Sequence, residues 1–269
     1  MLQRLSLLGL TIIAFVVTAV WQPGTGHADH PRTLTIAAAN SLKDALRAIL
    51  PIFEKDEGNV EVKVVWGPSQ TLRDQIAQGA PIDVFLPSSI DEINQLEKKE
   101  LTLKGTKQVY AETAMVLITQ TTLPARVSSL SDLPGSDVRR VAIGDPNTSS
   151  VGKFAAEVLK NTHLDGNLKS RYVYAEHSGA VLNLVATGEA EVGLVYRTDA
   201  INNKKVQILA EAPPDTHAPI VYALATVWTT KNPSLARNFG EFLLTPKIQD
   251  ILKTYGFERA APQLSTVLR

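Results

Sequence analysis

Two short segments near the start of the chain share a pattern: an apolar, β-rich run, a serine-containing turn and a helix-patterned stretch. The first turn contains Asn40 and Ser41, and the second contains Ser69. In each, the pattern predicts a serine at the helix N-cap, beside free backbone N–H groups and the positive end of the helix dipole. One such turn is commonplace, but further turns of this kind occur at Ser150 and Ser178. The set indicates helix N-termini that converge on a small oxyanion.

Strand and helix patterns alternate along the rest of the chain, which is typical of an α/β fold. Pro51 removes a hydrogen bond from the helix that begins at Ser41, so we expect a kink or a restart there. Two late helices begin with proline at their first helical position, at Pro233 and Pro246. The predicted strands span 33–38, 60–66, 82–86, 110–118, 141–144, 172–175, 192–196 and 220–229, and the other predicted helices span 70–78, 90–99, 152–161 and 179–187.

The order of these elements predicts two lobes joined by two crossing strands. The long strands 110–118 and 220–229 are the candidate crossings. Lobe one then comprises 29–113 plus 225–269, and lobe two comprises 114–224. In such an arrangement a ligand binds where strand ends and helix N-termini face the cleft.

The first residues have the pattern of an export signal. A short basic region ends at Arg4, an uncharged apolar stretch covers 5–20, and small residues at 26–28 suit a cleavage site. A permanent membrane anchor, which needs about 20 apolar residues, is the alternative. We predict a cleaved signal peptide over 1–28, a mature chain starting near Asp29 and a periplasmic location. The absence of cysteine argues against a lipid-anchored start, disulfides and thiolate sites.

Five segments, in chain order, resemble the substrate-binding proteins of bacterial molybdate ABC importers. They are AAANSLKDAL, GPSQTLRDQIAQGAPIDVFL, VAIGDPNTSSVGKFAAEVL, GEAEVGLVYRTDA and KTYGF. The resemblance implies a two-lobed periplasmic-binding-protein fold of type II, without enzymatic activity and without a cofactor. It also implies a monomer that captures molybdate, and tungstate too, and delivers it to an inner-membrane ABC permease and its ATPase.

The same resemblance implies a set of ligand-binding residues. In that family a tetrahedral dianion is held by serine hydroxyls, backbone N–H groups and one tyrosine hydroxyl, and molybdenum is present only as molybdate. Ser178 replaces an apolar residue of some relatives, so its N–H is the implied contact and its hydroxyl is an open question. Carried over residue by residue, the implied contacts are Ser41, Ser69, Val151, Ser178 and Tyr196, with Asn40 as a further candidate.

These donors suit an anion that carries no proton. Each charge-assisted hydrogen bond contributes about 1.5–3 kcal/mol, so about seven donors contribute on the order of 10 kcal/mol before closure costs. No lysine or arginine occupies the four turns, and we expect Lys43, Arg73 and Lys153 to face solvent. Hydroxyls and amides do not titrate between about pH 6 and 8.5, so we expect a nearly pH-independent affinity that only the nearby His177 could change.

Other functions remain open on the residues alone. A receptor for sulfate or phosphate is the nearest, although monohydrogen phosphate wants a facing acceptor such as Asp145 or Glu176. A ferric-ion receptor needs paired tyrosines and carboxylates, whereas only Tyr196 is suitably placed. A transferase of this fold carries its cofactor on cysteine, and this chain has no cysteine. A transcription-factor effector domain follows a helix-turn-helix, whereas here the predicted export signal stands in that place. His177 and Ser178 lack a Gly-x-Ser-x-Gly elbow, so no catalytic residue is predicted. The balance of 27 basic and 27 acidic residues gives no field for nucleic acid or an anionic membrane.

Overall fold

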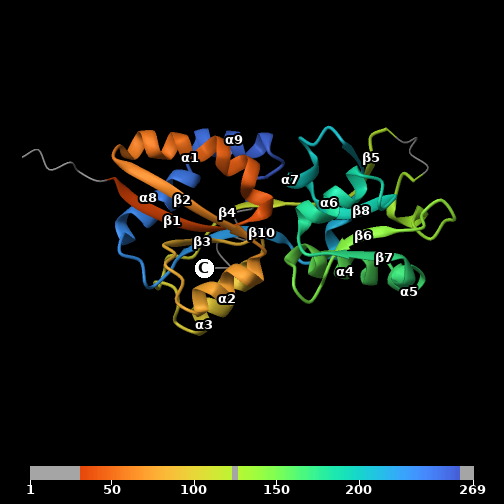
Figure 1. The fold of residues 1–269 in the computed structure, drawn as a ribbon, viewed down its shortest axis with the longest axis horizontal. Helices are drawn as coiled ribbons and strands as arrows, with labels where there is room; N and C mark the ends of the chain where they lie inside the picture. Colours follow the sequence, from red (N-terminus) through yellow and green to blue (C-terminus); the bar gives the residue numbers. More distant parts are fainter. Residues whose placement is uncertain (1–30, 123–126, 261–269) are drawn as a thin grey trace, which may run out of the picture. The chain divides into compact units, whose positions relative to one another are not determined.

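Two five-stranded sheets organise the chain in the computed structural model, which describes residues 31–122 and 127–260 (Figure 1). The first sheet has the strand order β2-β1-β3-β10-β4, and the second has the order β7-β6-β8-β5-β9. In each sheet three neighbouring strands are parallel, and the fourth in order runs antiparallel to them. Each sheet with its helices is called a lobe below, and both lobes belong to one compact unit. The predicted two-lobed α/β fold is confirmed, while the predicted signal peptide, 1–28, lies outside the described residues.

Helices cover both faces of the first sheet, which explains why its interior strand β1 is largely apolar. Ile36 packs into the core formed with α1, α8 and α9, whereas Ala37 packs on the other face with α2 and α3 (Figure 1). Strands buried on both faces characteristically form such apolar runs. The elements of this lobe are β1 (Arg32–Ala39), η1 (Asn40–Leu42), α1 (Lys43–Glu57), β2 (Val60–Gly67), α2 (Ser69–Ala77), β3 (Val84–Leu86), α3 (Ile90–Lys98), β4 (Gln108–Thr113), β10 (Ile220–Thr226), α8 (Pro233–Leu243) and α9 (Pro246–Thr254).

The second sheet is covered in the same way. Along β5, Leu117 packs into the core that contains α4, and the next residue, Ile118, packs on the opposite face with α6. The elements of this lobe are β5 (Met115–Gln120), η2 (Leu130–Asp132), β6 (Val141–Gly144), α4 (Ser150–Asn161), α5 (Asp165–Leu168), η3 (Lys169–Arg171), β7 (Tyr172–Ala175), α6 (Ser178–Ala186), β8 (Val192–Tyr196), α7 (Arg197–Ala200) and β9 (Val206–Glu211). A short turn, η4 (Pro214–Thr216), follows them.

The chain crosses between the lobes twice. The predicted strand 110–118 is two strands, since β4 ends at Thr113 in the first sheet and β5 begins at Met115 in the second. The return runs through 212–219, because β10 pairs with β3 and β4 along its length. The return crossing therefore lies N-terminal to the predicted crossing at 220–229 and to the predicted lobe boundary at 224. The division into 29–113 with 225–269 and 114–224 otherwise stays a prediction.

Two local features differ from the sequence predictions. Helix α1 runs through Pro51 without a restart, and Pro51 lies on its exposed side, where water can satisfy the carbonyl that loses its partner. Strand β9 was not predicted. It lies at the edge of the second sheet, and only Val206 among its residues is buried, so its apolar pattern is weak.

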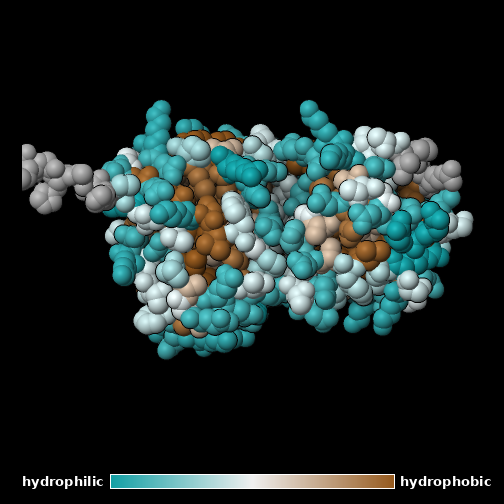
Figure 2. Space-filling view, in the orientation of Figure 1, coloured by the Kyte–Doolittle hydropathy of each residue, from teal (hydrophilic) through white to brown (hydrophobic). Residues whose placement is uncertain are grey.

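The surface is mainly polar on the face drawn in Figure 2, with apolar side chains visible over the strands of both sheets. The largest exposed apolar side chains are Trp228 and Tyr174, which are 55% and 54% exposed. Across the part of the chain that the structure describes, no helix combines the length and the apolar character needed to span a bilayer.

Two glycines allow α4 to begin directly against the end of β6. A Cβ added to Gly152 would lie 2.4 Å from the carbonyl oxygen of Gly144 and 2.5 Å from that of Asp145. A Cβ added to Gly144 would lie 2.6 Å from the backbone nitrogen of Gly152. Backbone atoms cannot move aside alone, so this contact fixes the N-terminus of α4 on the second sheet.

We expect Gly152→Ala to lower the free energy of unfolding by about 1–3 kcal/mol, the usual cost of overpacking. Gly166→Ala is the matched control, because a Cβ there meets nothing within 4 Å and alanine is favoured over glycine in a helix by up to ~1 kcal/mol. Urea unfolding of both variants measures the difference, and equal stability would contradict the close helix–strand contact.

Candidate functional site

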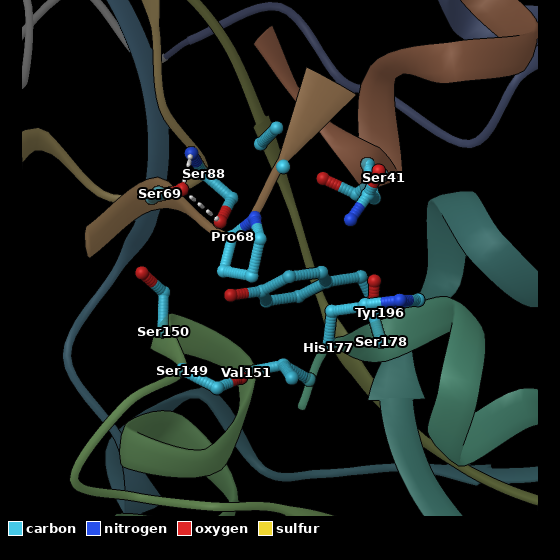
Figure 3. Close-up of a pocket in the computed structure, with 13 residues that line it drawn as sticks. Ser41, Pro68, Ser69, Ser88, Ser149, Ser150, Val151, His177, Ser178 and Tyr196 are labelled. Carbon is cyan, nitrogen blue, oxygen red and sulfur yellow. Dashed lines mark hydrogen bonds between the residues drawn. The ribbon is translucent and has the colours of Figure 1, made fainter. Parts of the chain in front are cut away.

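A small pocket lies between the lobes, at the carboxyl ends of six parallel strands (Figure 3). Parallel α/β sheets characteristically bind ligands at this edge. The space open to the centre of a water-sized sphere is about 20 Å³. A single water needs roughly 10–15 Å³ by the same measure, so the pocket fits a ligand of a few atoms. The lining residues are Ala39, Asn40, Ser41, Gly67, Pro68, Ser69, Ser88, Ser149, Ser150, Val151, His177, Ser178 and Tyr196.

All six residues predicted to hold a ligand line this one pocket. Asn40 and Ser41 follow β1, Ser69 follows β2, and the second lobe contributes the rest from the ends of β6, β7 and β8. Their binding roles stay a prediction. Sequence reasoning did not select Ser88, although it follows β3 as the other serines follow their strands.

The four serines of the predicted turns are not helix caps. Helices α2, α4 and α6 each begin at the serine itself, and Ser41 is the middle residue of η1. A capping side chain accepts from the N–H groups of its own helix, as Nδ1 of His177 does from the Ala180 nitrogen at 3.1 Å. One residue further on, the serine hydroxyl is left available to the pocket. The cap positions are Ala39, Pro68, Ser149 and His177.

Two of these hydroxyl oxygens already accept a hydrogen bond from a buried donor. The Tyr222 hydroxyl donates to Oγ of Ser41 at 2.9 Å, and the Ser88 N–H donates to Oγ of Ser69 at 3.0 Å. Oγ of Ser88 also lies 3.1 Å from Oγ of Ser69. Since a hydroxyl has one proton to donate, an oxygen that is already an acceptor can still donate toward the pocket.

Two further hydroxyls in the pocket have no partner. Oγ of Ser150 and the hydroxyl of Tyr196 are buried and form no hydrogen bond with any described residue. Figure 3 shows both pointing into the pocket. Burial raises the pKa of Tyr196 well above 10, so its hydroxyl stays protonated. Buried polar atoms are almost always hydrogen-bonded, so these two indicate a ligand or water in the pocket.

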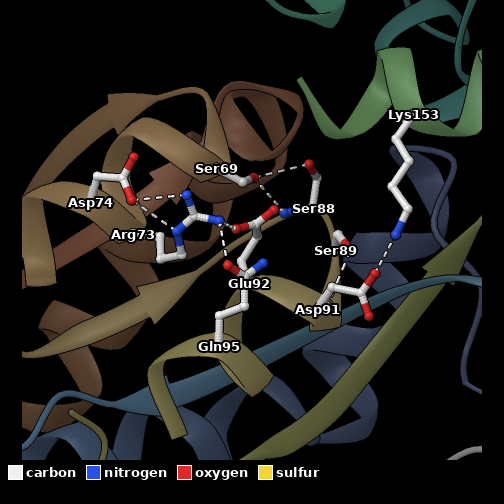
Figure 4. Close-up of polar contacts among 9 residues, drawn as sticks. All are labelled: Ser69, Arg73, Asp74, Ser88, Ser89, Asp91, Glu92, Gln95 and Lys153. Carbon is white, nitrogen blue, oxygen red and sulfur yellow. Dashed lines mark hydrogen bonds and ion pairs between the residues drawn. The ribbon is translucent and has the colours of Figure 1, made fainter. Parts of the chain in front are cut away.

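No charged side chain is among the lining residues, yet charged pairs brace the helices around the pocket (Figure 4). Arg73 does not face solvent as predicted: its side chain is 17% exposed and donates to Oε2 of Glu92 at 2.7 Å. This pair joins α2 to α3, the helices that follow Ser69 and Ser88. Burial raises the pKa of Glu92, although Arg73 opposes the shift.

Another ion pair, unlike the pair of Arg73 with Glu92, connects one lobe to the other. Lys153, in the first turn of α4, pairs with Asp91 in the first turn of α3 (Figure 4). The hydrogen bond with Asp91 raises the pKa of Lys153. Both side chains are about half exposed, so the pair closes the outer rim of the pocket rather than lining it.

Asp199, on α7, adds a buried titrating group near Ser178. Burial raises the pKa of its carboxyl from 3.8 to about 7, although the Ser178 hydroxyl opposes the shift. Its Oδ2 is buried without a hydrogen-bond partner among the described residues. The expected pH-independent affinity stays a prediction, and Asp199 is a further nearby group whose change of charge would alter the affinity.

Comparison with known proteins places the chain in a family. Residues 34–258 match the family described as bacterial extracellular solute-binding protein. The chain is a bacterial extracellular solute-binding protein. YvgL of Bacillus subtilis, named as an ABC transporter substrate-binding lipoprotein, is 33% identical over 96% of this solute-binding protein and 99% of its own length.

Two further relatives are named for a ligand. The molybdate-binding protein ModA of Haemophilus influenzae is 32% identical to this solute-binding protein, over 83% of this chain and 89% of its own. The solved structure of the periplasmic molybdate-binding protein of Azotobacter vinelandii is 25% identical, with a TM-score of 0.77, and the match covers 85% of this chain and 100% of that one.

We expect Asp199 to make the stability of this solute-binding protein fall as pH rises from about 4 to about 7. Because the pKa of Asp199 is raised in the folded state, the folded protein still holds this proton at pH values where the unfolded chain has released it. The contribution of Asp199 to stability is therefore complete below the unfolded-state pKa and is lost as the pH rises to the folded-state pKa. At about 1.4 kcal/mol per pKa unit, the loss is up to ~4 kcal/mol. Urea unfolding at pH 4 and pH 8 measures it. Asp199→Asn lacks this loss, and identical pH profiles for wild type and variant would contradict the assignment.

Proposed function

We propose that this solute-binding protein captures molybdate in the pocket between its lobes and delivers it to an ABC importer. The relatives named for molybdate support the choice of ligand. The observation that carries the proposal is the donor set: the pocket offers hydroxyls and helix N-termini, two of its buried hydroxyls lack partners, and it is lined by no charged side chain. The proposed ligand-binding residues are Ser41, Ser69, Val151, Ser178 and Tyr196, with Asn40 and, in addition, Ser150.

The geometry favours a small, fully ionised oxyanion over other solutes. The space available in this structure is too small for an organic ligand of the size of a sugar or a peptide. Monohydrogen phosphate must donate a proton, but neither Asp145 nor Glu176, the acceptors near the turns in sequence, is among the lining residues. Tungstate has the same charge and shape as molybdate, so we propose that it binds too.

The remaining parts of the proposal concern location and partners. A cleaved signal peptide over 1–28 would deliver the mature chain, as a monomer, to the periplasm. There it would dock on an inner-membrane permease driven by an ATPase. Because the proposed donors come from both lobes, the ligand favours the closed arrangement through differential contacts.

Calorimetric titration with molybdate, tungstate, sulfate and phosphate at pH 7.5 tests the ligand. We expect molybdate and tungstate to bind with micromolar or tighter affinity, about −8 kcal/mol or better, and the other two at least about tenfold more weakly. Preferential binding of sulfate or phosphate would overturn the proposal in favour of another oxyanion receptor.

Ser41→Ala and Ser69→Ala are each expected to weaken molybdate binding by about 1.5–3 kcal/mol, the value of a hydrogen bond to a charged group. Ser89→Ala is the matched control, because Ser89 is buried in a neighbouring turn but is absent from the pocket lining. Its Oγ caps α3 by accepting from the Asp91 nitrogen at 3.4 Å. The control should cost about 1 kcal/mol of stability and leave affinity unchanged. Unaltered affinity in both serine variants would remove these turns from the site.

The pair between Lys153 and Asp91 is expected to slow ligand release. Lys153→Ala should raise the molybdate dissociation rate about two- to fivefold, in keeping with the 0.2–1 kcal/mol of a half-exposed pair, and high salt should reduce the difference. Lys160→Ala, an exposed lysine in the last turn of the same helix, is the control. Stopped-flow displacement measures both rates. The same rate in both variants at low salt would show that the pair does not hold the lobes together.

A further inference from the structure

Tyr222 is a buried residue that contacts the site but is not among the proposed ligand-binding residues. It lies in the middle of β10, is 0% exposed, and is absent from the pocket lining. Its hydroxyl donates to Oγ of Ser41 at 2.9 Å. The Tyr222 hydroxyl is therefore connected to the pocket through Ser41.

The position of the Tyr222 hydroxyl is tightly fixed. The Tyr222 ring packs against Tyr110, Tyr196 and Phe257, with ring centroids 6.4, 6.3 and 5.0 Å away. The pairing of β10 with β4 also shifts register between Tyr222 and Ala223. Such irregularities redirect a side chain relative to its strand. Packing and backbone together thus aim this hydroxyl at Ser41.

The bond has a defined direction. Burial raises the pKa of Tyr222 well above 10, so its hydroxyl is protonated wherever the protein is folded. The geometry makes the Tyr222 hydroxyl the donor and Ser41 Oγ the acceptor, so the proton of Ser41 points away from Tyr222. Among the described residues, Ser41 Oγ has no other hydrogen-bond partner, so the pocket is the remaining direction for that proton.

We propose that Tyr222 is a positioning residue, which holds the Ser41 hydroxyl as an obligate donor and so makes the pocket select oxyanions without a proton. The inference rests on the proposed function, because it requires an oxyanion to occupy the pocket. An anion such as molybdate offers only acceptors and gains from the fixed donor. Monohydrogen phosphate presents a proton as well, and at Ser41 that proton meets another donor.

The test compares Tyr222→Phe with Tyr110→Phe. Both variants delete one buried hydroxyl from the same aromatic cluster, but the Tyr110 hydroxyl has no partner among the described residues and Tyr110 is outside the pocket. Calorimetry gives the molybdate affinity, and competition against molybdate gives the phosphate affinity, both at pH 7.5. Thermal unfolding confirms that each variant folds.

In Tyr222→Phe the Ser41 hydroxyl is free to rotate. We expect molybdate binding to weaken about fivefold to twentyfold, as for a lost hydrogen bond, while phosphate binding is unchanged or tighter, and Tyr110→Phe matches the wild type. In a Ser41→Ala background, Tyr222→Phe should have no additional effect, because the hydroxyl it orients is gone.

The outcomes separate this inference from the proposed function. Failure of the wild type to bind molybdate would overturn the function itself. If the wild type binds, the inference is overturned by equal affinities in the two phenylalanine variants, by an equal loss for molybdate and phosphate, or by a full additional loss in the Ser41→Ala background.

Discussion

The site depends on the unpaired N–H groups at helix N-termini, which the topology gathers at one edge of each sheet. Every helix that follows a parallel strand begins at the carboxyl end of that strand, and both sheets place three such strands side by side. Two lobes of one topology therefore present donors to the same small volume. The helix N-termini give this volume a positive potential without lysine or arginine. For the proposed anion, these neutral donors would take the place of a positively charged side chain.

Three of the serine hydroxyls around the pocket are available because each of these serines lies one position after the helix N-cap. A serine at the cap position would spend its oxygen on the helix, whereas Ser69, Ser150 and Ser178 open their helices at the next position. Two buried donors, the Tyr222 hydroxyl and the Ser88 N–H, then restrict the directions in which the Ser41 and Ser69 hydroxyls can donate. Of these two residues, Ser88 lines the pocket and Tyr222 does not.

Local patterns in the sequence predicted the alternating elements and the serine turns, because strand and helix periodicity and turn chemistry are local properties. The bounds of β6, β7 and β8 agree with prediction to the residue. What the sequence could not reveal depends on contacts between distant segments: the edge strand β9, the pairing of Arg73 with Glu92, and the burial of Asp199. Tyr222 belongs with these, since 181 positions separate it from Ser41 and its apolar strand resembles any buried strand.

The crossing between β4 and β5 consists of Ala114 alone. The Ala114 carbonyl accepts from the Arg197 N–H at 2.9 Å, and Thr113 Oγ1 donates to the Gly256 carbonyl at 3.0 Å. One residue between two hydrogen-bonded strands offers only a pair of backbone torsions, while the return through 212–219 offers many. Because the first crossing has so few free torsions, fewer conformations are lost there when a ligand holds the two lobes together.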